Sequence, residues 1–99
     1  MYLVDQMLEE IVTKLFLYFK LRRVKNMFLI GVLRHLKKNL SKSITEVEIL
    51  SYIEKVVDVI KDWLKIVDHD SGKSLRKTKE YPLKKLKDII KQYLKDNRK

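Results

Sequence analysis

The chain has 99 residues, the length of one small domain, and it contains no cysteine, which excludes a disulfide framework and a thiolate zinc site. No apolar run reaches the roughly 20 residues of a membrane span, and the acidic residues Asp5, Glu9 and Glu10 near the N-terminus are unlike a secretory signal, so we expect a soluble intracellular protein. A formal net charge of +10 favours polyanionic partners.

The first predicted element is a helix over residues 3–19. Its apolar stripe has the 3.6-residue helical spacing and consists of Val4, Met7, Leu8, Ile11, Val12, Leu15, Phe16 and Phe19. The same face would next carry Arg22, Arg23 and Asn26, so the register breaks there. We therefore expect the chain to turn between Lys20 and Asn26. The alternative is one long helix whose buried face changes partner.

A second apolar segment with a rotated face covers residues 27–40 and contains Gly31. Residues 44–67 follow, and their apolar side chains lie within an arc of about 200° on a helical wheel, with charged side chains on the remaining arc. This periodicity outweighs the β-branched content, which favours a strand only mildly. We therefore expect one long helix over residues 44–67.

Two overlapping capping boxes mark the start of this long helix, Ser43 with Glu46 and Thr45 with Glu48. Its apolar arc is wider than one neighbouring helix covers. The helix is therefore expected either at the centre of a compact bundle or at a contact with a second subunit.

The segment after residue 67 has the composition of a turn, Asp68-His69-Asp70-Ser71-Gly72-Lys73-Ser74. The residues on either side of it would pair as a short β-hairpin near 64–78, which is the alternative to a plain loop. Pro82 suits the first turn of a last helix, whose narrow apolar stripe of Leu83, Leu86, Ile89, Ile90, Tyr93 and Leu94 is flanked by lysines. The whole pattern predicts a mainly α fold, with residues 1–99 forming a single domain of three or four helices.

Neither a catalytic constellation nor a metal site is predicted. Gly72-Lys73-Ser74 lacks the earlier glycine of a phosphate-binding loop, because Val67 occupies that position. Asp68, His69 and Asp70 are adjacent, and adjacent residues rarely converge on one metal ion. Only one other histidine, His35, occurs in the chain. We therefore expect a non-enzymatic protein with no cofactor.

Charge is uneven along the chain, with a net of +5 in residues 1–40, −3 in residues 41–70 and +8 in residues 71–99. The stretch FKLRRVKN, residues 19–26, groups cations as several neighbouring phosphates require. The candidate nucleic-acid-binding residues are the cations of this stretch, Arg34 and the lysine face of the last helix: Lys20, Arg22, Arg23, Lys25, Arg34, Lys84, Lys85, Lys87 and Lys91. The alternative is an exposed helix corner that merely collects charge.

Segments such as SYIEKVVDVIKDWLKIV and YPLKKLKDIIKQYLKD are rich in Ile, Lys and Val and contain neither Ala nor Cys. In length and composition the chain resembles the small proteins of filamentous, enveloped DNA viruses that infect hyperthermophilic archaea. The resemblance carries no motif, so no site residue follows from it. It implies a thermostable viral protein in the host cytoplasm or the virion that acts on viral DNA.

Two functions follow from these observations. The first is a basic protein that binds nucleic acid by phosphate contacts, without a recognition helix that reads bases. The second is a protein-interaction or structural module, homo-oligomeric through residues 44–67, whose charge serves solubility and heat stability. An acidic membrane surface is a competing partner for the last helix.

Overall fold

A computed structural model describes residues 2–96 of the chain and the side chains from Met7 to Asp96. Within this range the elements in chain order are α1 (Tyr2–Arg22), β1 (Asn26–Phe28), α2 (Leu29–Asn39), α3 (Glu46–Val59), β2 (Leu64–His69), β3 (Gly72–Lys77) and α4 (Leu83–Asp96). The prediction of a mainly helical protein is confirmed, since the four helices contain most of these residues.

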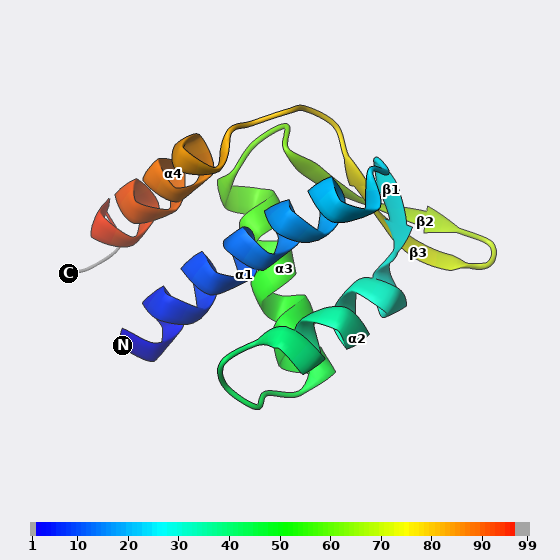
Figure 1. Cartoon of the computed structure of the whole chain (residues 1–99), viewed down its shortest axis with the longest axis horizontal. Coiled ribbons are helices and arrows are strands. Elements are labelled where there is room, and N and C mark those ends of the chain that lie inside the picture. Colours follow the sequence, from blue (N-terminus) through cyan, green and yellow to red (C-terminus); the bar gives the residue numbers. More distant parts are fainter. Residues whose placement is uncertain (1, 97–99) are drawn as a thin grey trace.

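The three strands form one antiparallel sheet in the order β1-β3-β2 (Figure 1). The hairpin near 64–78, which was the alternative to a plain loop, is present as β2 and β3. The sheet is larger than a hairpin because β1 pairs with the other edge of β3. Strand β1 was not predicted, because its three residues are too few for an alternating pattern to be recognised. One face of the sheet packs on the helices through Leu75, which is fully buried.

The prediction of one long helix over residues 44–67 is wrong for its last third, residues 60–67. Helix α3 ends at Val59, the chain turns through Asp62, which has a φ of 67°, and residues 64–69 form β2. Pairing with β3 satisfies the backbone of this segment, and the β-branched Ile66 and Val67 suit a pleated strand. The start of α3 follows the second predicted capping box, in which Thr45 and Glu48 accept each other's backbone N–H groups.

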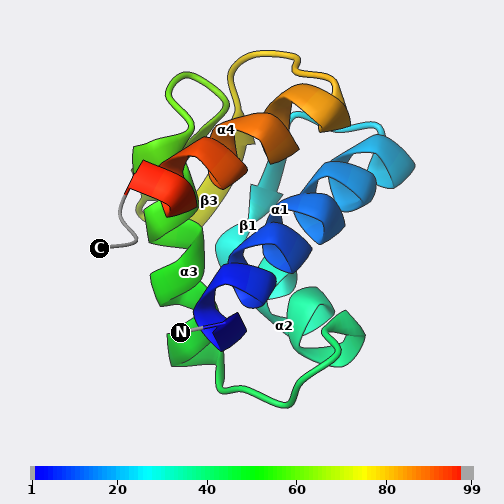
Figure 2. The same ribbon diagram turned by 90° about the vertical axis from the view of Figure 1, so that its left-hand side faces the viewer.

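The apolar face of α3 is covered within one copy of the chain. Ile49, Ile53 and Val56 are fully buried, and α3 contacts α1, α2, α4 and β2. Figure 2 shows α4 lying across α1 and α3. The centre of this face is therefore buried within one copy of the chain, while Val47, near the start of α3, stays exposed.

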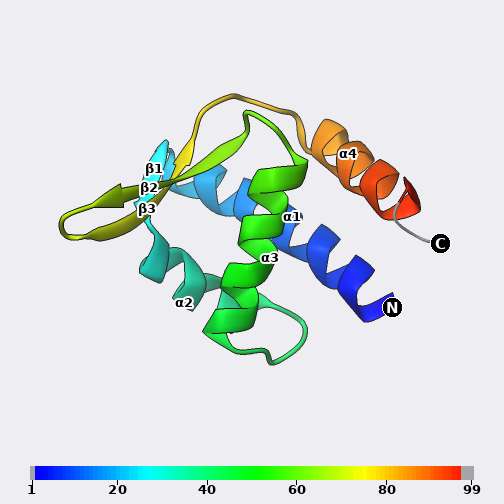
Figure 3. The same ribbon diagram turned by 180° about the vertical axis from the view of Figure 1, so that it is seen from behind.

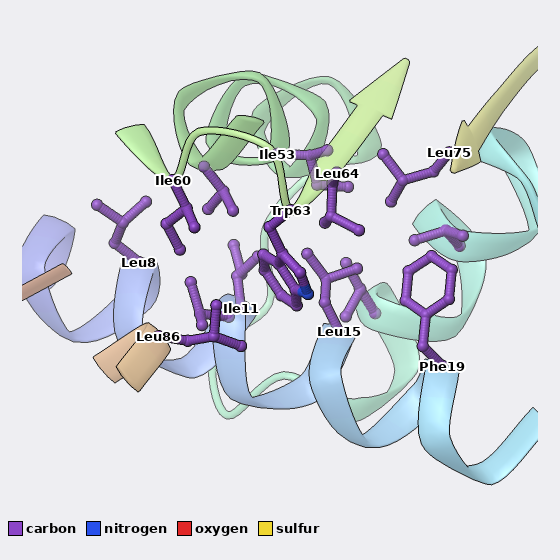
Figure 4. Packing of buried hydrophobic residues seen from close by; sticks show 14 of the residues in the cluster. Leu8, Ile11, Leu15, Phe19, Ile53, Ile60, Trp63, Leu64, Leu75 and Leu86 are labelled. Carbon is purple, nitrogen blue, oxygen red and sulfur yellow. The ribbon is translucent and has the colours of Figure 1, made fainter. Parts of the chain in front are cut away.

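The core joins the sheet to the helices around Trp63, whose indole lies among Ile11, Leu15 and Leu64 (Figure 4). The stripe predicted for the first helix is buried from Met7 through Phe19, except for the half-buried Phe16. Val4, also part of that stripe, lies outside the described side chains. None of the helices over residues 2–96 combines the length and the apolar character that a membrane crossing requires.

The predicted break between Lys20 and Asn26 is confirmed, and Arg23 makes the turn. This residue has a φ of 55°, and its N–H donates to the carbonyl of Phe19 at 2.9 Å. The single bond from a left-handed residue back to the last helical turn is the αL type of helix end, at which glycine is preferred. A side chain at such a φ costs roughly 1–2 kcal/mol.

Replacing Arg23 with glycine is therefore expected to raise the free energy of unfolding by about 0.5–1 kcal/mol, because glycine adopts this φ without strain. Urea denaturation followed by circular dichroism measures the change. The matched control is Arg22→Gly, which removes the same charge one residue earlier, inside α1, and is expected to lower stability by about 1 kcal/mol. A loss of stability in both variants would contradict the prediction.

Candidate nucleic-acid interface

The loop between β3 and α4 is held against the turn that follows α3. The hydroxyl of Thr78 donates to the carbonyl of Asp62 at 2.6 Å, and its N–H donates to the carbonyl of Trp63 at 2.8 Å. The hydroxyl of Tyr81 donates to the carbonyl of Lys61 at 3.2 Å. These bonds hold the loop after β3 beside residues 61–63, which lead into β2.

The end of α1 is joined to the same place through the backbone. The N–H of Lys77 donates to the carbonyl of Lys25 at 2.6 Å, one residue beyond the pairing of Asn26 with Arg76. Two residues of the stretch FKLRRVKN, Lys25 and Asn26, are thus held at the edge of β3. Local sequence gives no sign of this contact, because about 50 residues of chain separate its partners.

Basic side chains from four segments gather around two adjoining hollows of about 500 and 440 Å³, which share Lys25, Lys77 and Glu80. We call this set of residues the basic corner, and it comprises Lys20, Arg23, Lys25, Lys65, Arg76, Lys77 and Lys79. In Figure 3 the end of α1, the base of the hairpin and the loop leading to α4 meet at this place. Glu80 is the one acid that lines these two hollows.

One of the seven positive charges is compensated. The ammonium of Lys77 lies 2.7 Å from the carboxylate of Glu80. A hydrogen bond from Lys77 and the charge of Lys77 lower the pKa of Glu80. A weaker effect of burial raises this pKa, and the charge of Lys25 adds a still smaller lowering. Glu80 is therefore ionised at neutral pH, and the basic corner keeps a large positive excess.

The structure separates the predicted binding residues into groups. Three of them, Lys20, Arg23 and Lys25, lie in the basic corner. Arg34 is exposed on α2. The lysines of α4 lie on a helix that packs against α1 and α3; Lys84, Lys85 and Lys91 are exposed, and Lys87 is half-buried.

Arg22 points to a different place from its neighbour Arg23. It lines a third hollow with Tyr18, whose ring stacks on His35 at a centroid distance of 3.7 Å. Burial, followed by the charges of Lys14 and Arg22, lowers the pKa of His35. The imidazole in this contact between α1 and α2 is therefore neutral at pH 7 and above.

Four residues of the basic corner were missed from the sequence: Lys65, Arg76, Lys77 and Lys79. The predicted helix over residues 44–67 puts Lys65 on its charged arc, away from any other cationic segment. The register of the sheet sets Lys65 directly opposite Arg76. Once β2 and β3 are recognised as a hairpin, this like-charged pair is a signal that could have been found.

No family model matches the chain, and a search of curated proteins found no match. Among residues 2–96, no three His, Cys, Asp or Glu side chains come together in a way that could hold a metal ion. We therefore infer a function from the geometry and the charge of the chain.

Helices α2 and α3 are consecutive and joined by residues 40–45, and the β2–β3 hairpin follows them. The order of two helices is that of a helix-turn-helix motif, although the turn of that motif has only three or four residues. The second helix of that motif enters the major groove of DNA when it reads bases. The exposed residues of α3 are Val47, Glu48, Ser51, Glu54, Lys55 and Asp58. Among these exposed residues there are three acids and one lysine, so this surface of α3 would repel phosphates. The helix is therefore poorly suited to the major groove of DNA.

Proposed function

We propose that the protein binds nucleic acid through phosphate contacts at the basic corner. The observation that carries the proposal is the convergence of seven cationic side chains, from α1, the following turn, the sheet and the loop to α4, on two adjoining hollows. A polyanion gains affinity when several of its phosphates are neutralised at once, because condensed counterions are released. Viral DNA is the polyanion we expect if the chain is of the viral kind that its sequence resembles.

The contacts proposed are with the backbone of the nucleic acid. Arginine and lysine at the basic corner bind phosphate oxygens, which position a protein but carry no base sequence. The acidic surface of α3 supports this reading, since the helix that would read bases in a helix-turn-helix protein lacks the charge to approach them. We therefore expect little preference for sequence.

The second candidate function is a protein-interaction or structural module. It is favoured by large apolar side chains that stay exposed on the helices, among them Leu21 at 76% and Val47 at 77% exposure. These two lie on α1 and α3, outside the basic corner. Such a module would form a defined oligomer in sedimentation experiments and would be indifferent to DNA.

Titration of a short labelled DNA by fluorescence anisotropy tests the first function. If six phosphates are neutralised, affinity is expected to fall about a thousandfold between about 50 and 200 mM salt. The absence of binding at the lower concentration, despite the net charge of +10, would contradict the proposal and favour the interaction module.

A further inference from the structure

The face of the sheet turned away from the helices continues the basic corner. Successive residues of a strand point to opposite faces, so two rows of side chains cross this outer face. The row at the basic corner consists of Asn26, Arg76 and Lys65. The next row consists of Phe28, Ser74 and Val67. The outer face therefore carries cations in one row and an aromatic ring in the next.

Phe28 is unusually open for an aromatic residue of a sheet, since 60% of its surface is exposed. Its cross-strand neighbour Ser74 is only 3% exposed, although it lies on the same face. The hydroxyl of Ser74 lies 2.8 Å from Nε2 of His69. The phenyl ring of Phe28 is therefore far more exposed than the serine beside it on the same face.

Phe28 also borders a hollow of about 560 Å³. Tyr18 and Arg22 of α1, Met27 and Phe28 of β1, Val32 of α2 and His69 of the hairpin are among the residues that line it, so the hollow reaches from the sheet to both helices. A volume of several hundred Å³ is that of a pocket for a small organic ligand, and it exceeds what one nucleobase needs. Aromatic rings that stack and polar groups that bond base edges are the means by which proteins hold unpaired bases.

We propose that the outer face of the sheet binds a single-stranded segment of nucleic acid, with an unpaired base stacked on Phe28 and the adjoining phosphates on Arg76 and Lys65. The proposal rests on the proposed function and names its substrate class. Diagonal neighbours on paired strands lie about 7–8 Å apart, so Phe28 and Arg76 can meet the base and phosphate of neighbouring nucleotides. In a duplex both faces of an internal base are already stacked, and Phe28 would have no partner.

The test compares a single-stranded oligothymidylate with a duplex of the same length, using the wild type, Phe28→Ala and Phe28→Trp. We expect the wild type to bind the single strand more tightly than the duplex. Phe28→Ala should weaken single-strand binding by about tenfold or more, the loss typical of one stacked base, and should change duplex binding less than twofold. Phe28→Trp should retain the affinity, and the indole fluorescence should be quenched when the oligothymidylate binds.

The matched control is Ile30→Ala, since Ile30 is similarly exposed, at 55%, and lies two residues away. Equal binding of both nucleic acids with no effect of Phe28→Ala would overturn this inference and leave the proposed function standing. So would an equal loss in the Ile30→Ala variant, or a Phe28→Trp protein that binds without any change in fluorescence. Failure to bind either nucleic acid would overturn the proposed function as well. The Trp variant keeps the test decisive if Phe28→Ala does not fold.

Discussion

Replacement of Lys25, Lys65 and Arg76 by glutamate is expected to weaken DNA binding on the order of a thousandfold at about 50 mM salt. These three cations lie in the basic corner, and two of them face each other across paired strands. Each lost phosphate contact means that about one counterion fewer is released on binding. The magnitude of the slope of log affinity against log salt should therefore decrease by about three. Anisotropy titrations at several salt concentrations measure both quantities.

The matched control is the replacement of Lys84, Lys85 and Lys91 by glutamate, which changes the net charge by the same amount. These lysines are exposed on α4 and line neither of the two hollows of the basic corner. We expect this variant to lose less than tenfold in affinity. An equal loss in both variants would show that total charge governs binding, and it would return the α4 lysines to the site.

Trp63→Ala is expected to lower the free energy of unfolding by about 3–5 kcal/mol. The indole is 1% exposed and lies at the centre of the core (Figure 4), where α1 meets the start of β2. The substitution leaves a cavity that the surrounding large side chains fill only in part. Small domains are stable by about 5–15 kcal/mol, so the variant should be close to unfolded. Urea denaturation followed by circular dichroism measures the difference.

The control for this prediction is Val47→Ala, which truncates a side chain that is 77% exposed on α3. Its expected change lies within about 0.5 kcal/mol of zero. A cost of less than about 1 kcal/mol for Trp63→Ala would mean that the indole is not packed as described. The position of the turn between α3 and β2 would then have to be explained by contacts other than those of Trp63.

The local elements of this fold could be predicted from the sequence. The stripe from Met7 to Phe19, the turn at Arg23, the Thr45 cap and the helix after Pro82 all depend on residues within a few positions of one another. Helical periodicity, capping and turn formation act over that range, so pattern and structure agree. Three cations of the basic corner were found in the same way, because they are neighbours in the sequence.

The tertiary structure decided the rest. Residues 60–67 have apolar spacing that suits a helix, yet residues 60–63 form a turn and residues 64–67 pair with β3 as part of β2. The sheet then sets Lys65 beside Arg76 and brings Lys25 to Lys77, although no local pattern joins them. The physical reason is that backbone pairing between strands stabilises contacts distant in sequence, and it outweighs the weak local preference of a short segment. Composition and charge by themselves pointed to a small basic helical protein, while the position of its basic corner and of the exposed Phe28 came from the folded sheet.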